Sequence, residues 1–568
     1  MVTLTVLLLL ASVTIHCHNA QQQSTIFINA STTTHVSIKP GLPYPINITL
    51  HSTTTLYYSV IIVQVHTQKN VLWLASHNGG VVNGSHVGLL ELLRVGVVTL
   101  QYQVMSYRHS NNESDTPVMI VTQLLRNEVP IPGGCATVSQ LEYDPNLYLT
   151  YTRYTSTWNF SDADQGFSSS SYHSAPPTCD DANESRYPPV RNLEYFAYAY
   201  FLPERSYSQS EMFSGIEKML SSDGVTSHSK KSKHLLFQDP KKVTYGTTAG
   251  QGVVYNVVVR DLTTGATSAY VPMVTYSCDF YAKIGRCDSP GSVINKVVGS
   301  LVGLLGLFLC LFGHRLFDVE LVVLLIVIFS LLLFIIITRT TDWSHNVRVS
   351  TSIAIGMTVS IPFILIWCFS GYYYPFVILF GFFMSFLLGC TLMYTPIGNL
   401  SYFNYNYVYG LALGCCTIIF MLPFVLFAKV LNITLCAVIG SFGVILCIGS
   451  FLQNSLTDII TDMLLHATLP GYSNSINSHP YQFTEIILTC FWPILLVGGL
   501  VTQYVITCKR PSFPKSPYKR FKEWRKNYSD RSVNHYQQEK RRLVPFDSDN
   551  VDYGSLSNAS IDVINSDR

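Results

Sequence analysis

The chain has 568 residues, of which 48% are hydrophobic and only 12% are charged, about half of the roughly 25% that soluble globular proteins carry. The shortage is local, because residues 297–507 contain only ten Asp, Glu, Lys or Arg residues. This distribution excludes a soluble enzyme and a disordered scaffold, and it predicts a polytopic membrane protein. The net charge of +2 says little, because the two ends of the chain are charged very differently.

The first twenty residues have the pattern of a secretory signal peptide. Their apolar run, Leu4 to Ile15, is shorter than the about 20 residues that a transmembrane helix needs, and Ala20 suits the position before a cleavage site. No Lys or Arg precedes the run, so a membrane-retained anchor is the alternative. We expect residues 1–20 to be a signal peptide that directs the following residues into the secretory pathway.

Residues 21–290 have the features of an exported, glycosylated ectodomain. Six N-x-[ST] sequons lie there and a seventh lies in a later loop, which predicts glycosylation at Asn29, Asn47, Asn83, Asn112, Asn159, Asn183 and Asn399. The ectodomain also holds four cysteines, and an even number in an oxidising compartment predicts two disulfide bonds with three possible connectivities. We favour Cys278–Cys287 as a local bond and Cys135–Cys179 as a longer one.

The ectodomain sequence predicts β-sandwich or barrel strands. Short runs of alternating β-branched residues are separated by Asn, Gly, Ser and Pro clusters, and the clearest runs are 57–65, 97–104, 118–124 and 252–259. One helix is expected at Ser210–Ser221, and a long loop is expected at 161–189. The length fits two β-rich modules, which we place at residues 21–128 and 129–290.

The ectodomain sequence contains no recognisable catalytic or metal-binding pattern. The sequence lacks H-E-x-x-H, G-x-S-x-G and C-x-x-C, and its histidines do not have the spacing of metal ligands. Gly250-Gln251-Gly252 precedes a strand, whereas a dinucleotide loop must open a helix. We therefore expect a non-enzymatic protein with no cofactor, no metal and no nucleic-acid partner.

Seven apolar spans follow in residues 291–508, and each is long enough to cross a bilayer as a helix. They lie at about 293–313, 321–338, 350–369, 374–393, 407–427, 430–451 and 484–507. An odd number of spans after a lumenal N-terminus places the C-terminus in the cytosol. The tail from Lys509 to Arg542 agrees, because it has twelve Lys or Arg residues against three acids.

Two other classes of seven-span protein were considered. A G-protein-coupled receptor is disfavoured because the predicted cytosolic turns are very short and no Asp-Arg-Tyr ends the third span. A transporter or channel remains open, because ionisable residues inside spans mark permeation paths. The only candidates found are Glu485, Asp458 and Asp462, all near an interface, and Glu485 is the possible functional acid within the membrane. Gly299-x-x-x-Gly303 predicts close helix packing.

The cytoplasmic tail, residues 509–568, has two parts. Its basic part would be attracted to anionic lipid by about 1 kcal/mol for each Lys or Arg held near the surface, although it could simply anchor the topology. Its acidic last part contains Tyr553-Gly554-Ser555-Leu556, in which Tyr553 and Leu556 have the spacing of a sorting signal.

Several motifs together resemble the family of transmembrane 7 superfamily member 3. They agree in order and spacing over residues 130–520 and include Val129-Pro130-Ile131-Pro132-Gly133-Gly134-Cys135, Asp144-Pro145-Asn146-Leu147-Tyr148-Leu149, Tyr200-Phe201-Leu202-Pro203-Glu204, Phe312-Gly313-His314-Arg315 and Thr395-Pro396-Ile397-Gly398-Asn399-Leu400. The membrane part of that family is similar to transmembrane protein 198. The resemblance implies a multi-pass protein of the plasma membrane and secretory pathway that acts in cell survival and in the response to unfolded-protein stress. It carries over no catalytic, ligand or transport residue.

The sequence as a whole predicts a β-rich, sandwich-like ectodomain followed by a bundle of seven transmembrane helices. We expect the bilayer and an unknown extracellular protein or ligand as its partners. A transporter or channel with a regulatory ectodomain is the alternative function.

Overall fold

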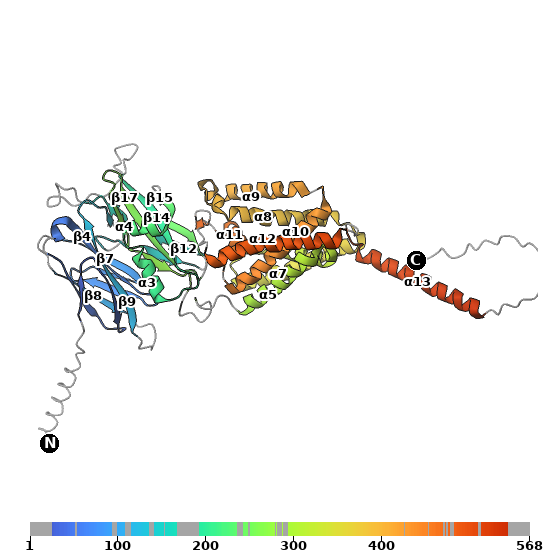
Figure 1. The fold of residues 1–568 in the computed structure, drawn as a ribbon, viewed down its shortest axis with the longest axis horizontal. Helices are drawn as coiled ribbons and strands as arrows, with labels where there is room; N and C mark the ends of the chain where they lie inside the picture. Colours follow the sequence, from blue (N-terminus) through green and yellow to red (C-terminus); the bar gives the residue numbers. More distant parts are fainter. Residues whose placement is uncertain are drawn as a thin grey trace, which may run out of the picture.

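The computed structural model has a β-rich region at one end, a helical bundle beside it, and a long helix that projects from the far end of the bundle (Figure 1). It describes residues 25–543 except for the gaps 52–53, 94–98, 108–114, 136–140, 153, 167–191, 236–241, 248–249, 279, 281–286, 288–292, 425, 453, 470–471, 473–474, 478–481 and 509–512. The expected signal peptide, Cys179, Asn112, Asn183, Tyr553 and Leu556 lie outside the described residues.

The first β module is a sandwich of two sheets. One sheet has the strand order β1-β3-β8-β5-β6 and the other has the order β2-β9-β4-β7. Alternate side chains from both sheets meet in a single core, as the period-two pattern of the sequence predicts. Its elements are β1 (Ile26–Asn29), β2 (Thr33–Ile38), β3 (Tyr44–Thr49), α2 (Thr54–Tyr57), β4 (Tyr58–His66), β5 (Leu72–Ser76), β6 (Val81–Gly84), β7 (His86–Leu92), β8 (Thr99–Ser106) and β9 (Thr116–Arg126).

The second β module is built around the long antiparallel pair β14–β17 and an aromatic core. Trp158 is fully buried there and stacks on Tyr245. Its elements are β10 (Ile131–Cys135), β11 (Tyr148–Tyr151), β12 (Thr155–Asn159), β13 (Asp162–Asp164), β14 (Leu193–Phe201), α3 (Gln209–Glu217), α4 (Ser222–His228), β15 (Lys230–Leu235), β16 (Lys242–Gly246), β17 (Val253–Asp261), β18 (Thr267–Ala269) and β19 (Met273–Thr275).

The two modules pack against each other through the central strands of the first. Every residue of β4 after its first is buried, because one face lines the sandwich core while the other contacts the second module. The side chain of Asn146 also bonds Gly88 twice, donating to the Gly88 carbonyl at 2.9 Å and accepting from its N–H at 2.7 Å. The ectodomain is therefore one packed body.

Two sequence predictions for the second module need correction. The helix expected at Ser210–Ser221 ends at Glu217, and a second helix, α4, follows it. Ser221 does not continue the first helix because its side chain accepts from the N–H of Gly224 and so caps the start of α4. The loop expected at 161–189 also contains the short strand β13, which pairs with β10.

Among its described residues, the helical region contains six stretches that are long and apolar enough to cross a membrane. The first stretch, Lys296–Thr340, has 45 residues. It would extend well beyond the about 30 Å hydrocarbon core as a single straight helix. The helices of this region are α5 (Val293–Phe312), α6 (Phe317–Thr340), α7 (His345–Ser370), α8 (Tyr374–Met393), α9 (Asn406–Met421), α10 (Ala428–Leu452), α11 (Asp458–Thr468) and α12 (Phe483–Thr507).

A 3₁₀ turn, η1 (Gly313–Leu316), divides this first stretch into α5 and α6. Gly299 of α5 lies against Ser450 near the end of α10, whereas Glu320 of α6 bonds Asn432 near the beginning of α10. At the other end of α6, Arg339 donates to the Ala467 carbonyl of α11. The chain thus crosses the bundle in α5 and returns in α6.

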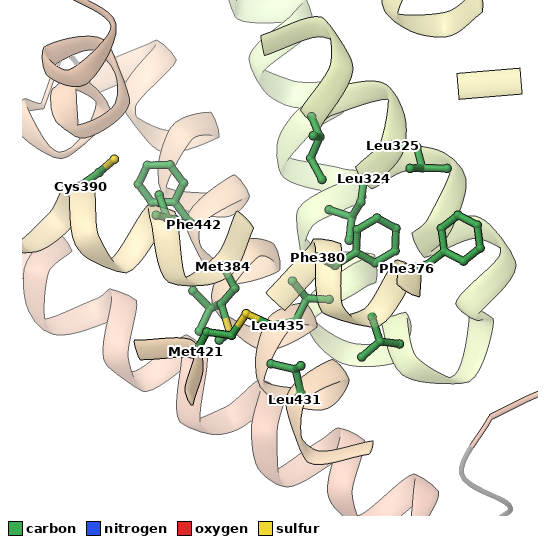
Figure 2. Close-up of a cluster of buried hydrophobic side chains, with 14 of the residues drawn as sticks. Leu324, Leu325, Phe376, Phe380, Met384, Cys390, Met421, Leu431, Leu435 and Phe442 are labelled. Carbon is green, nitrogen blue, oxygen red and sulfur yellow. The ribbon is translucent and has the colours of Figure 1, made fainter. Parts of the chain in front are cut away.

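The bundle core consists of large apolar side chains from α6 to α11, and most of them come from α6, α8 and α10 (Figure 2). Phe380 and Leu435 are fully buried in it. Many outward-facing side chains of the same helices are exposed and apolar, as expected of helices that face lipid. The bundle therefore has an apolar surface around an apolar core.

Helices α5 and α10 approach each other most closely through glycines. A Cβ added at Gly306 would lie 2.7 Å from the Gly440 carbonyl, and one added at Gly303 would lie 2.4 Å from the Cys447 Cβ. Gly299 and Gly303 therefore make the predicted close helix contact, and their partner is α10 of the same chain.

The basic tail forms a helix that the sequence analysis did not predict, α13 (Pro517–Leu543). Its described side chains are exposed along nearly all of its length. Near its beginning, Arg520 forms an ion pair with Asp318 of α6. This contact ties the start of α13 to the end of the bundle that lies away from the ectodomain.

Candidate functional site: the junction of ectodomain and bundle

The turn that follows β14 contacts two bundle helices at once. Glu204 accepts a hydrogen bond from the Thr484 N–H at 3.2 Å and another from the Thr484 hydroxyl, at the beginning of α12. The next residue, Arg205, donates to the Leu452 carbonyl at 3.0 Å, at the end of α10. We call Glu204 and Arg205 the clasp.

The charges of the clasp match the two helix ends that it touches. The first N–H groups of a helix lack partners within the helix and carry partial positive charge, so the Glu204 carboxylate suits the beginning of α12. The last carbonyls carry partial negative charge, so the Arg205 guanidinium suits the end of α10. Arg205 also adopts a φ of 54°, a conformation that costs a non-glycine residue about 1–2 kcal/mol. The turn holds this strained residue where it can reach α10.

The loop between α10 and α12 binds the ectodomain in return. Its short strand β20 (Ile476–Asn477) pairs in parallel with β16, so that Ile476 lies opposite Tyr245 and Asn477 opposite Gly246. The Gln482 side chain donates to the Leu202 carbonyl at 2.8 Å. The second β module and the bundle therefore share a sheet as well as the clasp.

A group of acids lies just inside the bundle below the clasp. Glu485, in the first turn of α12, is 7% exposed, and its carboxylate accepts from the Ser455 N–H at 3.2 Å. The Tyr394 hydroxyl donates to the Ser455 carbonyl at 2.7 Å. Asp458, Asp462 and Glu485 all lie close enough to Tyr394 to interact with it electrostatically. All three acids named from the sequence are thus gathered around one tyrosine.

Aromatic residues surround the deepest of these acids. Asp462 is 4% exposed and accepts from the Tyr472 hydroxyl at 2.9 Å. His466 stacks on Tyr409 with ring centroids 4.0 Å apart and meets Tyr472 edge-on. The helix α11 that carries Asp462 and His466 was not predicted.

A second polar cluster lies at the far end of the same two helices. Gln503 of α12 donates to the carbonyls of Leu309 and Cys310 at 3.0 and 2.7 Å, and Lys429 of α10 donates to the Thr507 carbonyl at 2.9 Å. Glu320, on the neighbouring α6, has no exposed surface. Helices α10 and α12 therefore connect the clasp to polar contacts at the opposite end.

Glu320 was not predicted as a candidate, because the second apolar span was expected to begin at residue 321. Helix α6 begins at Phe317 and includes Glu320, so the prediction that Glu485, Asp458 and Asp462 are the only candidate acids is wrong. The signal was present in the sequence, since Glu320 directly precedes a long apolar run.

The ectodomain contains a cavity of about 380 Å³ between its two modules. Asn83 and His86 line it from the first module, and Tyr148 and Phe280 line it from the second. The ammonium of Lys69 lies 5.7 Å from the centre of the Phe280 ring. The cavity combines apolar, aromatic and cationic groups, which is a composition suited to binding a ligand.

Two histidines lie in contact beside this cavity. The Nδ1 atoms of His66 and His86 are 3.4 Å apart. Burial lowers the pKa of His86 to about 3, and burial together with the neighbouring His86 lowers the pKa of His66 well below its ordinary value. Both rings are therefore neutral at physiological pH.

The expected disulfide between Cys278 and Cys287 is present, and Cys135 is also disulfide-bonded. Of the predicted glycosylation sites, Asn29, Asn83 and Asn159 are exposed and Asn47 is half-buried, while Asn399 ends the 3₁₀ helix η2 (Pro396–Asn399). No group of three or more metal-ligating side chains occurs within the described part of the chain.

Two sequence profiles match the chain in separate segments. Residues 130–281 match the "TM7SF3-like, second immunoglobulin-like domain" and residues 299–504 match the "TM7S3/TM198-like domain". A relative from Homo sapiens named "Transmembrane 7 superfamily member 3" is 30% identical over 485 residues, which cover 85% of this chain and 84% of the relative. The chain belongs to the transmembrane 7 superfamily member 3 family. A relative of the same name from Mus musculus is 32% identical over 78% of this chain and 77% of its own length.

The match assigns the two halves of the structure within the transmembrane 7 superfamily member 3 family. The second β module matches the second immunoglobulin-like domain of the family, and helices α5–α12 contain its multi-pass membrane domain. Among solved structures, a β-glucuronidase from Bacteroides uniformis shares 10% identity over 41% of this chain and 26% of its own, with a TM-score of 0.18. That likeness is too low to inform function.

Proposed function

We propose that this chain is a non-enzymatic, receptor-type membrane protein in which the ectodomain binds a partner and the clasp transmits that event to α10 and α12. The observation that carries this proposal is the contact of Glu204 and Arg205 with the ends of those two helices. A partner that changes the position of the β14 turn would act directly on both helices. The name of the relatives describes a membrane protein and no reaction.

The proposed topology has seven crossings with the ectodomain outside and α13 in the cytosol. The reversal of the chain between α5 and α6 supports seven crossings. The excess of Lys and Arg in α13 supports a cytosolic tail, which lies where it can contact anionic lipid. We place the protein in the plasma membrane and secretory pathway.

We further propose that the cavity between the two modules receives the extracellular or lumenal ligand. Its aromatic wall and the Lys69 ammonium favour a ligand with an apolar body and an anionic group. Membership of the family supports the role in cell survival and the unfolded-protein response that the sequence resemblance implied.

The proposal is tested by rescue of stressed cells that lack the protein. The variant Glu204→Ala/Arg205→Ala removes the clasp, and Glu211→Ala/Arg260→Ala is a matched control that removes one exposed acid and one exposed base elsewhere in the ectodomain. We expect both variants to reach the cell surface and only the control to restore survival. Full rescue by the clasp variant would show that the contact does not transmit a signal.

A transporter remains the second candidate because acids lie buried within the bundle. Glu320 is fully buried and Glu485 is nearly so. Such residues mark ion and substrate paths in membrane proteins. Solute flux into reconstituted vesicles that is lost on Glu485→Gln would favour this function over the receptor.

A further inference from the structure

Three buried polar side chains form a hydrogen-bonded group at the far end of the bundle, and no function has been assigned to them. The amide nitrogen of Asn432 on α10 lies 2.9 Å from the Glu320 Oε2 atom and 3.1 Å from the His314 Nδ1 atom. All three side chains are buried, with exposures of 0% for Glu320, 0% for Asn432 and 3% for His314. They join α6, α10 and the turn η1.

Both N–H groups of the Asn432 side chain are used within this group. The Asn432 amide has two N–H groups, and one bonds Glu320 while the other bonds His314. Because Asn432 donates, the His314 Nδ1 atom must accept and therefore carries no proton. His314 in this arrangement is neutral and supplies no positive charge to Glu320.

Two hydrogen-bond acceptors of this three-residue group remain without a donor. The Glu320 Oε1 and Asn432 Oδ1 atoms are both buried and have no hydrogen-bond partner within the described residues. A buried polar atom without a partner destabilises the fold, and a buried charge without a partner does so more strongly. A single proton on Oε1 removes the charge and gives Asn432 Oδ1 a donor.

We propose that Glu320 binds a proton and shares it with Asn432 in a cyclic pair of carboxylic acid and amide. In this pair the acid O–H donates to Asn432 Oδ1 while the Asn432 N–H donates to Glu320 Oε2. The proton is the ligand of the site, and its loss breaks one of the two bonds that hold α6 to α10.

The other titratable groups around the pair are accounted for. Cys436 of α10 lies next to Glu320 and Asn432, and Cys310 of α5 faces Cys436. On α6 itself, Asp318 is held by Arg520 and by the Trp367 indole, which donates to it at 2.9 Å. None of these groups is a cation that contacts Glu320.

The site lies close to the segment that leads into α13. The Phe513 ring meets the His314 ring edge-on, with ring centroids 5.4 Å apart, and stacks on the Tyr373 ring, with centroids 4.0 Å apart. Phe513 thus covers the three-residue polar group on the side where α13 begins. A proton that reaches Glu320 from that side must pass this aromatic cover.

The test is the infrared spectrum of the full chain in lipid nanodiscs at neutral pH. Glu320→Gln keeps the shape of the pair, because its amide can still donate to Asn432. We expect the wild type minus Glu320→Gln spectrum to contain the carbonyl band of a protonated carboxyl group. Glu211→Gln, at an exposed carboxylate of the ectodomain, is the control and should leave that band in place.

A second variant keeps the test decisive if Glu320→Gln fails to fold. Asn432→Leu removes the acceptor, and we expect it to keep the carboxyl band but shift it to higher frequency. A carboxylate signal in place of the acid band would overturn the proposal. So would a signal that depends on sodium or potassium, since the ligand would then be a metal cation.

Discussion

The glycine contact between α5 and α10 allows a quantitative prediction. Replacing Gly440 of α10 by alanine places a Cβ 2.5 Å from the Cys310 N, 2.6 Å from the Gly306 carbonyl and 2.8 Å from the Cys310 Cα. Carbon atoms pack best at about 3.5–4.0 Å, so α5 and α10 would have to separate by roughly 1 Å. Because the obstructing atoms are backbone, no side chain can rotate away.

The magnitude follows from a comparison with a second glycine. Forcing extra volume into a packed interior costs about 1–3 kcal/mol, whereas alanine gains about 1 kcal/mol over glycine through helix propensity. Gly414 lies within α9 with no atom within 4 Å of an added Cβ, so Gly414→Ala receives the gain without the cost. The two variants should therefore differ by about 1–3 kcal/mol, with Gly440→Ala the less stable.

The assay is unfolding of the full chain in mixed detergent micelles as the fraction of denaturing detergent is increased. Gly306→Ala, on the facing helix, should behave as Gly440→Ala does, since its Cβ would lie 2.7 Å from the Gly440 carbonyl. If Gly440→Ala and Gly414→Ala unfold together, the two helices do not touch as described and the reasoning is refuted.

Two further predictions concern the ectodomain. Because burial depresses the pKa of His66 and His86, the unfolded chain binds more protons below pH 6.5, so stability is present above that pH and falls as the pH decreases toward about 3. Each ring adds up to about 1.4 kcal/mol per pH unit to the dependence of the unfolding free energy on pH. Replacing both histidines by Gln should weaken this dependence in thermal unfolding measured across pH. An unchanged pH dependence would contradict the proposed role of the two histidines. Replacing Cys278 and Cys287 by serine removes a disulfide between residues nine apart in the sequence. This change should destabilise the ectodomain by about 2–3 kcal/mol, measured by denaturant titration. An unchanged free energy of unfolding would show that the bond is dispensable.

The membrane helices and most strands could be predicted because their signals are local. Helix α8 begins and ends where its apolar run does, at Tyr374 and Met393, since transfer to lipid requires a long apolar segment. Strands such as β8 follow the alternation of their own residues. The short helices α4 and α11 were missed because their apolar patterns are brief and contacts with neighbouring elements decide them.

The candidate site could be predicted only in part. Glu485 was found because an acid at the edge of an apolar span is conspicuous in the sequence. Glu204 was not found, because its partner Thr484 lies 280 residues away and no local pattern connects the two. Glu320 was missed through an error of four residues in the beginning of α6. A charge adjacent to an apolar run therefore deserves the same weight as one inside it.

The clasp holds the ectodomain and the bundle together, and hydrogen exchange at the beginning of α12 tests this contact directly. In the wild type, the Thr484 N–H donates to Glu204 and should exchange slowly. A hydrogen bond to a charged group contributes about 1.5–3 kcal/mol, so Glu204→Ala should accelerate exchange there about tenfold or more while Glu211→Ala leaves it unchanged. Equal exchange in the wild type and Glu204→Ala would contradict the account, because the ectodomain would then not hold this helix.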